Sequence, residues 1–89
     1  MTTPRFCFVI PCFDEQDNVG PTIGSVREAM GERNDYEVIL VNDASTDRTL
    51  ERMQALAADP RILVLDNPSN LGFGGSYKRG AALQLRPTS

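Results

Sequence analysis

Residues 36–41, YEVILV, form one of three apolar runs that decide the fold of this 89-residue chain. The other two are residues 6–10, FCFVI, which Pro11 closes, and residues 62–65, ILVL. Runs that are apolar on both faces are typical of parallel strands that helices cover on each side of the sheet. We therefore expect three buried, parallel strands.

Between these runs the spacing of apolar residues becomes helical. Residues 19–30 carry Val, Ile, Val and Met at intervals of four, three and four, which predicts a helix that begins near residues 18–20 and ends at Gly31. A second helix is predicted after the cap-rich residues 45–47 and before Asp59-Pro60. A third is predicted from about Gly74 to Leu85.

The resulting order is β-α-β-α-β-α, an α/β chain with a Rossmann-like, three-layer parallel sheet. With 89 residues, 40% of them hydrophobic and 24% charged, the chain is long enough for one small globular domain.

Composition excludes several classes of protein. Nine Lys and Arg against 12 Asp and Glu give a net charge of −3, so no nucleic-acid partner is expected. The apolar runs are too short to span a membrane, and the N-terminus lacks the apolar segment of a signal peptide. Cys7 and Cys12, in a chain without histidine, predict reduced thiols in a cytoplasmic protein rather than a zinc site.

Carboxylates follow each predicted strand. Asp14, Glu15, Asp43 and Asp66 should converge at one rim of the sheet, because ligands of open α/β sheets bind beyond the carboxyl ends of the strands. There they can accept hydrogen bonds from a base or a ribose, bind a hard cation, or simply cap helices. Capping is favoured for Asp47, which lies in a predicted first helical turn, and a functional role is favoured for Asp43.

The glycine-rich residues 70–80, NLGFGGSYKRG, match neither the Walker loop nor the dinucleotide fingerprint. Two interpretations stay open for this segment. Amides at a helix start, with Lys78 and Arg79 one turn later, can meet a diphosphate. Alternatively, the segment is a flexible turn followed by a solvated basic face.

Three motifs together resemble the N-terminal part of a family 2 glycosyltransferase with the GT-A fold. Residues 9–15, VIPCFDE, are similar to the family's V-I-P-x-(Y/F)-N-E opening, and residues 38–49, VILVNDASTDRT, to E-I-I-V-V-D-D-G-S-T-D-G-T. Residues 70–75, NLGFGG, resemble N-x-G-x-(G/S)-x-A. The resemblance covers about residues 5–82 and is closest in style to the polyprenol-phosphate sugar transferases.

The resemblance implies a nucleotide site and assigns residues to it by position. The implied nucleotide-binding residues are Pro11, Phe13, Glu15, Val41 and Asp43. Tyr77 stands where many relatives carry an arginine that approaches the diphosphate, so Lys78 or Arg79 would take that part. Asp14 and Asn42 also depart from the usual asparagine and aspartate of the motifs.

The same resemblance implies what residues 1–89 do not contain. In the family, a D-x-D motif that holds Mg²⁺ or Mn²⁺ and a catalytic base follow the third helix, but this chain ends at Ser89. We therefore expect an incomplete, truncated GT-A domain with no metal site and no catalytic residue of its own, inactive in isolation. The parent activity would transfer a sugar from a UDP- or GDP-sugar to a lipid-phosphate or glycan acceptor, with the parent possibly at the cytoplasmic membrane face.

Two other interpretations remain. A receiver-like regulatory α/β domain shares the acidic strand ends, and Asp14-Glu15 and Asp66 partly fit it, but it needs more strands than this chain supplies. The other interpretation is a non-functional fragment whose first strand is an exposed edge, which would favour self-association.

Overall fold

The computed structural model describes residues 4–84 of the chain, in which strands and helices alternate as the apolar pattern predicts. Their bounds are β1 Phe6–Cys12, α1 Val19–Met30, β2 Tyr36–Asn42, α2 Thr49–Leu56, β3 Ile62–Asp66 and α3 Gly72–Gln84. The predicted end of the last helix at Leu85 lies outside the described residues.

The three strands form one parallel sheet in the order β1-β2-β3. Val38 of β2 is level with Phe8 of β1 and with Ile62 of β3. At the other end of the strands, Asn42 is level with Cys12 and with Asp66. The carboxyl ends of the strands therefore meet at one rim, which is the geometry expected for the polar residues that follow them.

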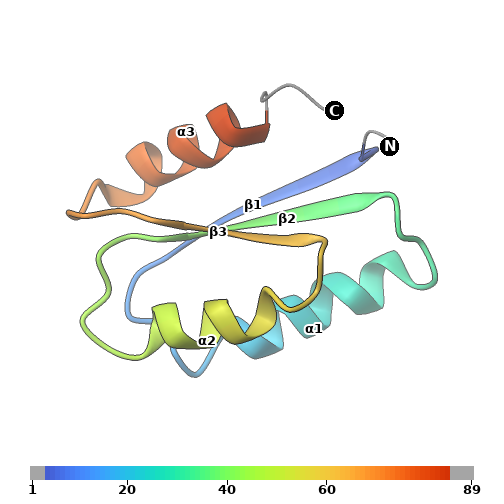
Figure 1. Ribbon diagram of the computed structural model, residues 1–89, viewed down its shortest axis with the longest axis horizontal. Coiled ribbons are helices and arrows are strands. Elements are labelled where there is room, and N and C mark those ends of the chain that lie inside the picture. The colour runs from blue at the N-terminus through green and yellow to red at the C-terminus, as the bar shows by residue number, and fades with distance from the viewer. Residues whose placement is uncertain (1–3, 85–89) are drawn as a thin grey trace.

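Helices cover both faces of the sheet, which confirms the three-layer arrangement. Figure 1 shows α1 and α2 side by side on one face and α3 on the other. The helices cover both faces of the central strand β2, and residues 38–43 are all buried. This double cover explains why the strand is apolar on both faces.

The larger core lies between the sheet and the α1–α2 layer. Ile23 of α1, Leu40 of β2 and Met53 of α2 are at most 1% exposed and pack there with Val19 and Val38. The helical spacing of Val19 and Ile23 places both on the face that contacts the sheet.

On the opposite face, Gly80 lets α3 approach the sheet closely. A Cβ atom at this position would lie 2.4 Å from Cγ1 of Val9 and 3.2 Å from Cγ2 of Val41. Only a residue without a side chain fits there, so Gly80 sets the distance between α3 and the first two strands.

Strand β1 lies at one edge of the sheet, as the sequence leads us to expect. The carbonyl of Cys12 accepts a hydrogen bond from the Asp43 amide at 2.9 Å, and the Phe6 amide donates to the Asp35 carbonyl at 3.2 Å. Since alternate residues of a parallel strand bond to the same neighbour, the nitrogen of Pro11 points away from β2. The proline therefore costs no hydrogen bond of the ladder.

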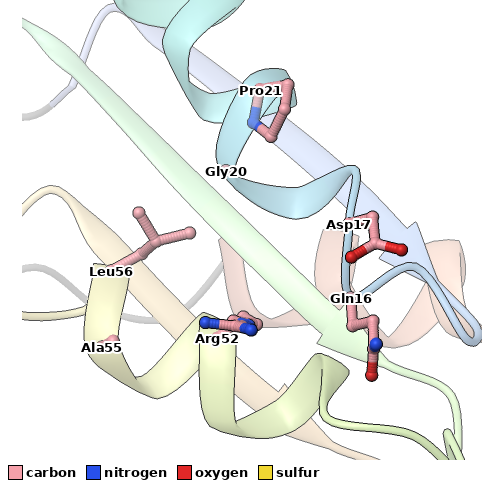
Figure 2. A pocket seen from close by; sticks show the side chains of 7 residues that line it. All are labelled: Gln16, Asp17, Gly20, Pro21, Arg52, Ala55 and Leu56. Carbon is pink, nitrogen blue, oxygen red and sulfur yellow. The ribbon is translucent and has the colours of Figure 1, made fainter.

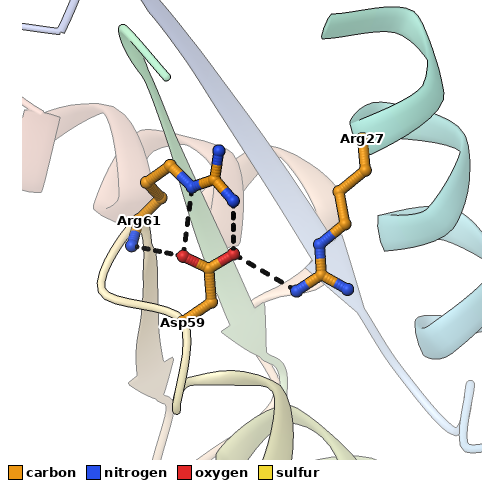
Figure 3. Close-up of polar contacts among 3 residues, drawn as sticks. All are labelled: Arg27, Asp59 and Arg61. Carbon is orange, nitrogen blue, oxygen red and sulfur yellow. Dashed lines mark hydrogen bonds and ion pairs between the residues drawn. The ribbon is translucent and has the colours of Figure 1, made fainter. Parts of the chain in front are cut away.

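One carboxylate ties helix α1 to the start of β3. Asp59 accepts hydrogen bonds from the Arg61 amide at 2.9 Å and from the Arg61 guanidinium at 3.1 and 3.0 Å, and from Nη2 of Arg27 at 3.2 Å (Figure 3). These donors, those of Arg61 foremost, lower the pKa of Asp59 to about 2. The turn after α2 therefore connects helix α1 to the sheet.

Candidate functional site

A cavity of about 210 Å³ opens at the carboxyl ends of β1 and β2. Its lining residues are Pro11, Cys12, Phe13, Glu15, Asp43 and Phe73. Four of these are residues that the resemblance assigns to a nucleotide site: Pro11, Phe13, Glu15 and Asp43. The structure thus brings together side chains from three separate motifs of the sequence.

Asp43 is the most constrained group of the cavity. It is only 4% exposed, and its Oδ1 accepts hydrogen bonds from the Leu71 amide at 2.6 Å and from Nδ2 of Asn67 at 3.0 Å. Its Oδ2 accepts from the Gly72 amide at 2.9 Å. The Leu71 amide, first among these donors, lowers the pKa of Asp43, so the carboxylate is ionised near neutral pH.

The bonds of Asp43 explain why α3 begins earlier than the sequence predicts. The amides at the start of a helix have no hydrogen-bond acceptor within the helix. Here the Asp43 carboxylate, at the end of β2, accepts hydrogen bonds from two of them. Gly72 takes a φ of 74°, which glycine adopts without strain. The helix therefore starts at Gly72 instead of about Gly74.

The two predicted diphosphate contacts lie farther along α3, on its exposed surface. Nη1 of Arg79 donates to the carbonyl of Asp66 at 3.2 Å and to Oδ1 of Asn67. The buried Asn67 also donates to the Ser76 hydroxyl at 2.9 Å. Arg79 is thus tied to the end of β3, and Lys78 is exposed beside it; the role of both residues stays a prediction.

Val41 occupies a different position from the other predicted site residues. Its side chain is fully buried and lies beneath α3, next to Gly80. It packs in the core between the sheet and α3, while the cavity opens beyond the end of its strand. Its assignment to the nucleotide site also stays a prediction.

The loops that follow β1 and β2 are bonded to each other. Oδ1 of Asp14 accepts from the Thr46 amide at 2.7 Å, and the Asp14 amide donates to the Ser45 hydroxyl at 3.0 Å. The Glu15 amide donates to Oγ1 of the buried Thr49 at 2.8 Å. Asp14, which takes a φ of 51°, thus directs its carboxylate to Thr46 of the second loop and is not among the residues that line the cavity.

Asp47 lies two residues before helix α2, not in its first turn as predicted, and binds the first residue of the helix. Its Oδ1 accepts from the amide and the hydroxyl of Thr49, the first of these at 2.9 Å. Burial acts to raise the pKa of its carboxyl, but the hydrogen bonds from Thr49 and from the Gln16 amide together outweigh it and lower that pKa. This acid therefore stabilises the helix start.

Cys12 forms part of the cavity wall as a neutral thiol. Burial, with a smaller contribution from the charge of Glu15, raises its pKa to about 11. A thiol in this state is a poor nucleophile, so Cys12 contributes shape rather than reactivity.

Residues 4–84 contain no group of three or more His, Cys, Asp or Glu side chains that could hold a metal ion. Within the same residues, no helix has the length and apolar character needed to cross a membrane.

A second cavity, of about 370 Å³, lies between α1 and α2. In Figure 2, Arg52 and Leu56 of α2 face Gly20 and Pro21 of α1 across it. Gln16 and Asp17 lie at one end, and Ala55 completes the lining. The sequence motifs assign no residue to this cavity.

Phe73 lines the first cavity although the sequence analysis did not select it. With the helix predicted to begin at Gly74, Phe73 lies in the preceding turn, and the direction of its ring cannot be predicted from the sequence. An aromatic residue between two glycines of the third motif was the signal that could have found it.

Comparisons with known proteins agree with the geometry. Residues 7–83 match the Glycosyl transferase family 2. An undecaprenyl-phosphate mannosyltransferase from Micrococcus luteus is 35% identical over 77 residues, which are 85% of this chain and 30% of that protein. A polyprenol monophosphomannose synthase from Mycolicibacterium smegmatis is 33% identical over 86 residues, 94% of this chain and 31% of that protein.

Solved structures share the fold. A mannosyltransferase from Pyrobaculum calidifontis, in complex with GDP-Man and Mn²⁺, superposes with a TM-score of 0.76 at 21% identity, over 98% of this chain and 26% of that one. Staphylococcus aureus TarS gives a TM-score of 0.72 at 23% identity, over 92% and 24%. The α/β layers of residues 4–84 therefore have the same fold as part of these two larger chains.

The chain thus spans less than a third of the two relatives described above. Within that span, the match over residues 7–83 includes all three motifs whose residues surround the cavity. This chain belongs to glycosyl transferase family 2.

Proposed function

We propose that the cavity at the carboxyl ends of β1 and β2 binds the nucleoside of a nucleotide-diphosphate sugar. The observation that carries the proposal is the meeting of Pro11, Phe13, Glu15 and Asp43 around one cavity. A nucleoside offers a flat apolar ring with polar edges and a sugar with hydroxyl donors. An aromatic side chain, a proline and two carboxyl groups are complementary to both parts.

The proposed parent activity is transfer of a sugar from a UDP- or GDP-sugar to a lipid-phosphate or glycan acceptor. The names of two relatives, an undecaprenyl-phosphate mannosyltransferase and a polyprenol monophosphomannose synthase, support a lipid-phosphate acceptor. A structural neighbour was solved with GDP-Man, which supports a nucleotide-sugar donor. Lys78 and Arg79, on the helix that begins beside the cavity, are the cations proposed to meet the diphosphate.

We propose that residues 1–89 bind the nucleotide without transferring the sugar. The transfer requires a base for the acceptor hydroxyl and neutralisation of the leaving diphosphate. Residues 4–84 contain no group of three or more His, Cys, Asp or Glu side chains that could hold a metal ion by themselves. We assign Mg²⁺ or Mn²⁺ and the catalytic base to residues of the parent enzyme outside residues 1–89.

The receiver-like alternative is set aside because the family match covers residues 7–83.

Two further proposals concern the cellular location of the chain and its association with other copies of itself. A cytoplasmic location is proposed from Cys12, whose buried thiol forms no disulfide, as is usual in a reducing compartment. Self-association through the edge of β1 is proposed from the strand order.

Calorimetric titration of the 89-residue chain with UDP and with GDP tests the proposed function. We expect saturable binding of at least one nucleotide, which Phe13→Leu weakens roughly tenfold because stacking on a base is lost. Phe6→Leu is the matched control, since Phe6 is also partly exposed but lies at the opposite end of β1. An absence of heat at millimolar concentrations of both nucleotides would contradict the proposal and leave the non-functional fragment as the interpretation.

A further inference from the structure

A buried amide links an exposed arginine to a carboxylate of the cavity. The side chain of Asn67, which is 2% exposed, lies between Arg79 of α3 and Asp43, directly after β2. Its Oδ1 accepts a hydrogen bond from Nη1 of Arg79. Its Nδ2 donates to Oδ1 of Asp43 at 3.0 Å and to the Ser76 hydroxyl at 2.9 Å. The Asn67 amide therefore uses its oxygen and both of its protons.

The groups at the two ends of this chain of hydrogen bonds permit one orientation of the amide. A guanidinium donates hydrogen bonds and cannot accept them, whereas an ionised carboxylate accepts and cannot donate. The oxygen of Asn67 must therefore face Arg79, and its NH₂ group must face Asp43. Turning the amide over would place two oxygens together at one end and two sets of protons together at the other.

Arg79 bonds to neutral oxygens here. Its Nη1 also donates to the carbonyl of Asp66 at 3.2 Å, and within residues 4–84 its guanidinium forms no ion pair. Hydrogen bonds in series polarise one another, and the effect is larger where water is excluded, as it is at Asn67. The positive charge of Arg79 therefore strengthens the hydrogen bond that Asn67 donates to Asp43.

The place of the Asn67 side chain depends on this arginine. Without Arg79, the Asn67 oxygen would be buried and would lose its hydrogen-bond donor. A buried polar atom without a partner is costly, so the side chain would turn toward water and away from Asp43. An exposed residue of α3 thus controls a buried contact at the end of the central strand.

Asp43 keeps room for a ligand. Its carboxylate accepts hydrogen bonds from the Leu71 and Gly72 amides and from Asn67, and an ionised carboxylate offers about four acceptor positions. The Leu71 amide first, and Asn67 among the other donors, lower the pKa of Asp43 against the effect of burial. Since Asp43 lines the cavity, whatever keeps it ionised and in place also acts on a ligand there.

We propose that Arg79 is a positioning residue for the nucleoside, which acts by holding Asn67 in the orientation that donates to Asp43. This inference rests on the proposed function and gives Arg79 a task besides the diphosphate. A guanidinium has five N–H groups, so the bonds of Nη1 leave Nε and Nη2 for phosphate oxygens. The consequence is that Arg79 affects ligands that carry no phosphate at all.

The main experiment compares ligands with and without a diphosphate. We expect Arg79→Met to weaken the binding of uridine or guanosine to the 89-residue chain, followed by NMR titration, roughly threefold to tenfold, the value of one hydrogen bond. UDP and GDP should lose at least the same factor. Arg52→Met is the matched control, because it removes an exposed arginine from α2, on the opposite face of the sheet, and should leave every affinity unchanged (Figure 1).

A double-mutant cycle tests the route through Asn67. Asn67→Ala removes the amide, so Arg79→Met in that background should cause no further loss of nucleoside affinity. Losses that multiply would show that Arg79 acts on the nucleoside by another route. If Asn67→Ala does not fold, titration of the Asp43 carboxyl group decides the route instead.

That titration is followed at the carboxyl carbon of Asp43 by NMR, without any ligand. The pKa of Asp43 should be higher in Arg79→Met than in the wild-type chain, because a positive charge is removed and a hydrogen bond to the ionised form is weakened. Glu15, the other carboxyl group that lines the cavity, is the same in both proteins. Arg52→Met should leave the pKa of Asp43 unchanged, and a change of packing alone would not raise it.

The results distinguish this inference from the proposed function. A loss confined to UDP and GDP, with wild-type affinity for the nucleosides, would restrict Arg79 to the diphosphate and overturn the inference. An unchanged pKa of Asp43 in Arg79→Met would overturn the link through Asn67. If the wild-type chain binds neither nucleosides nor their diphosphates, the proposed function fails, while the pKa titration still shows whether Arg79 acts on Asp43.

Discussion

Gly80 shows how one residue sets the separation of two layers. A Cβ atom there would lie 2.4 Å from a methyl group of Val9, well inside contact distance, and the second neighbour, Val41, is fully buried. Neither side chain can move without disturbing the sheet, because β1 and β2 are paired along their whole length. The absence of a side chain at position 80 is therefore a packing requirement.

We expect Gly80→Ala to lower the free energy of unfolding by about 1–3 kcal/mol, the usual cost of overpacking. The measurement is urea denaturation followed by circular dichroism. Gly24→Ala is the matched control in α1, because nothing lies within 4 Å of the added Cβ. That control should stabilise the chain by about 0.5–1 kcal/mol, since alanine is the better helix former. Equal effects of the two changes would contradict the close approach.

The lowered pKa of Asp59 predicts how the stability of the chain depends on pH. Its pKa of about 2 in the folded chain lies below the ordinary value of 3.8, so the folded state favours the ionised form. Its contribution is present above about pH 4 and is lost as the pH falls through 2. Because Arg61 and Arg27 are partly exposed, we put the contribution at about 1–2 kcal/mol rather than the full value of the shift.

Asp59→Asn should therefore lower stability by about that amount at pH 7 and by much less near pH 2.5. Urea denaturation of both proteins at the two pH values measures the difference. Asp35→Asn is the comparison variant. Asp35 pairs with Arg33 alone and its side chain is 30% exposed against 13% for Asp59, so its pH-dependent loss should be smaller. A loss that is the same at both pH values would mean that charge is not the cause.

At the scale of elements, the starts of α2 and α3 are held by acids from the preceding loop and from strand β2. Asp43 binds the amides at the start of α3, and Asp47 binds the Thr49 amide at the start of α2. The loops after β1 and β2 are joined by Asp14 and Thr46 as well. Of the four rim carboxylates predicted from the sequence, Asp43 alone accepts from the amides of a helix start. Asp14 joins two loops, and Glu15 and Asp66 accept hydrogen bonds from the side chains of Asn18 and Asn42.

Hydrogen exchange tests this arrangement. The Leu71 and Gly72 amides, which in an uncapped helix exchange rapidly, should be protected to an extent approaching that of the β2 amides. In Asp43→Asn the protection should fall at these two amides while that of the α1 amides is retained. Rapid exchange of both amides in the wild-type chain would contradict the cap.

At the scale of the whole molecule, the sheet has two edges, and β1 forms one of them. The register and the Cys12 and Phe6 hydrogen bonds place the amide of Val9, like the nitrogen of Pro11, on the side away from β2. A strand edge of this kind can pair with another strand. This is the physical basis for the proposed self-association.

We expect sedimentation equilibrium to show concentration-dependent association of the 89-residue chain. Val9→Pro should reduce it, because proline removes an outward-facing donor without removing a bond to β2. Val9→Ala is the control for the lost side chain. A monomer whose melting temperature does not depend on concentration would exclude self-association through this edge.

Much of the fold could be predicted from local patterns. The apolar runs around Ile39 and the helical spacing from Val19 to Met30 report burial directly, because each depends only on which faces of an element avoid water. The start of α3 could not be predicted in this way. It depends on the Asp43 carboxylate, which is 28 residues away from Leu71 in the sequence.

The sequence by itself determined the α/β order, the parallel sheet, the glycosyltransferase family and four of the residues around the cavity. These follow from periodicity and from motifs, which are properties of neighbouring residues. Only the tertiary structure decided that Asp43 holds α3, that Arg79 bonds to the end of β3, and that Phe73 joins the cavity. Each of these depends on distances between segments far apart in the chain, which close only when the sheet and its two helical layers pack together.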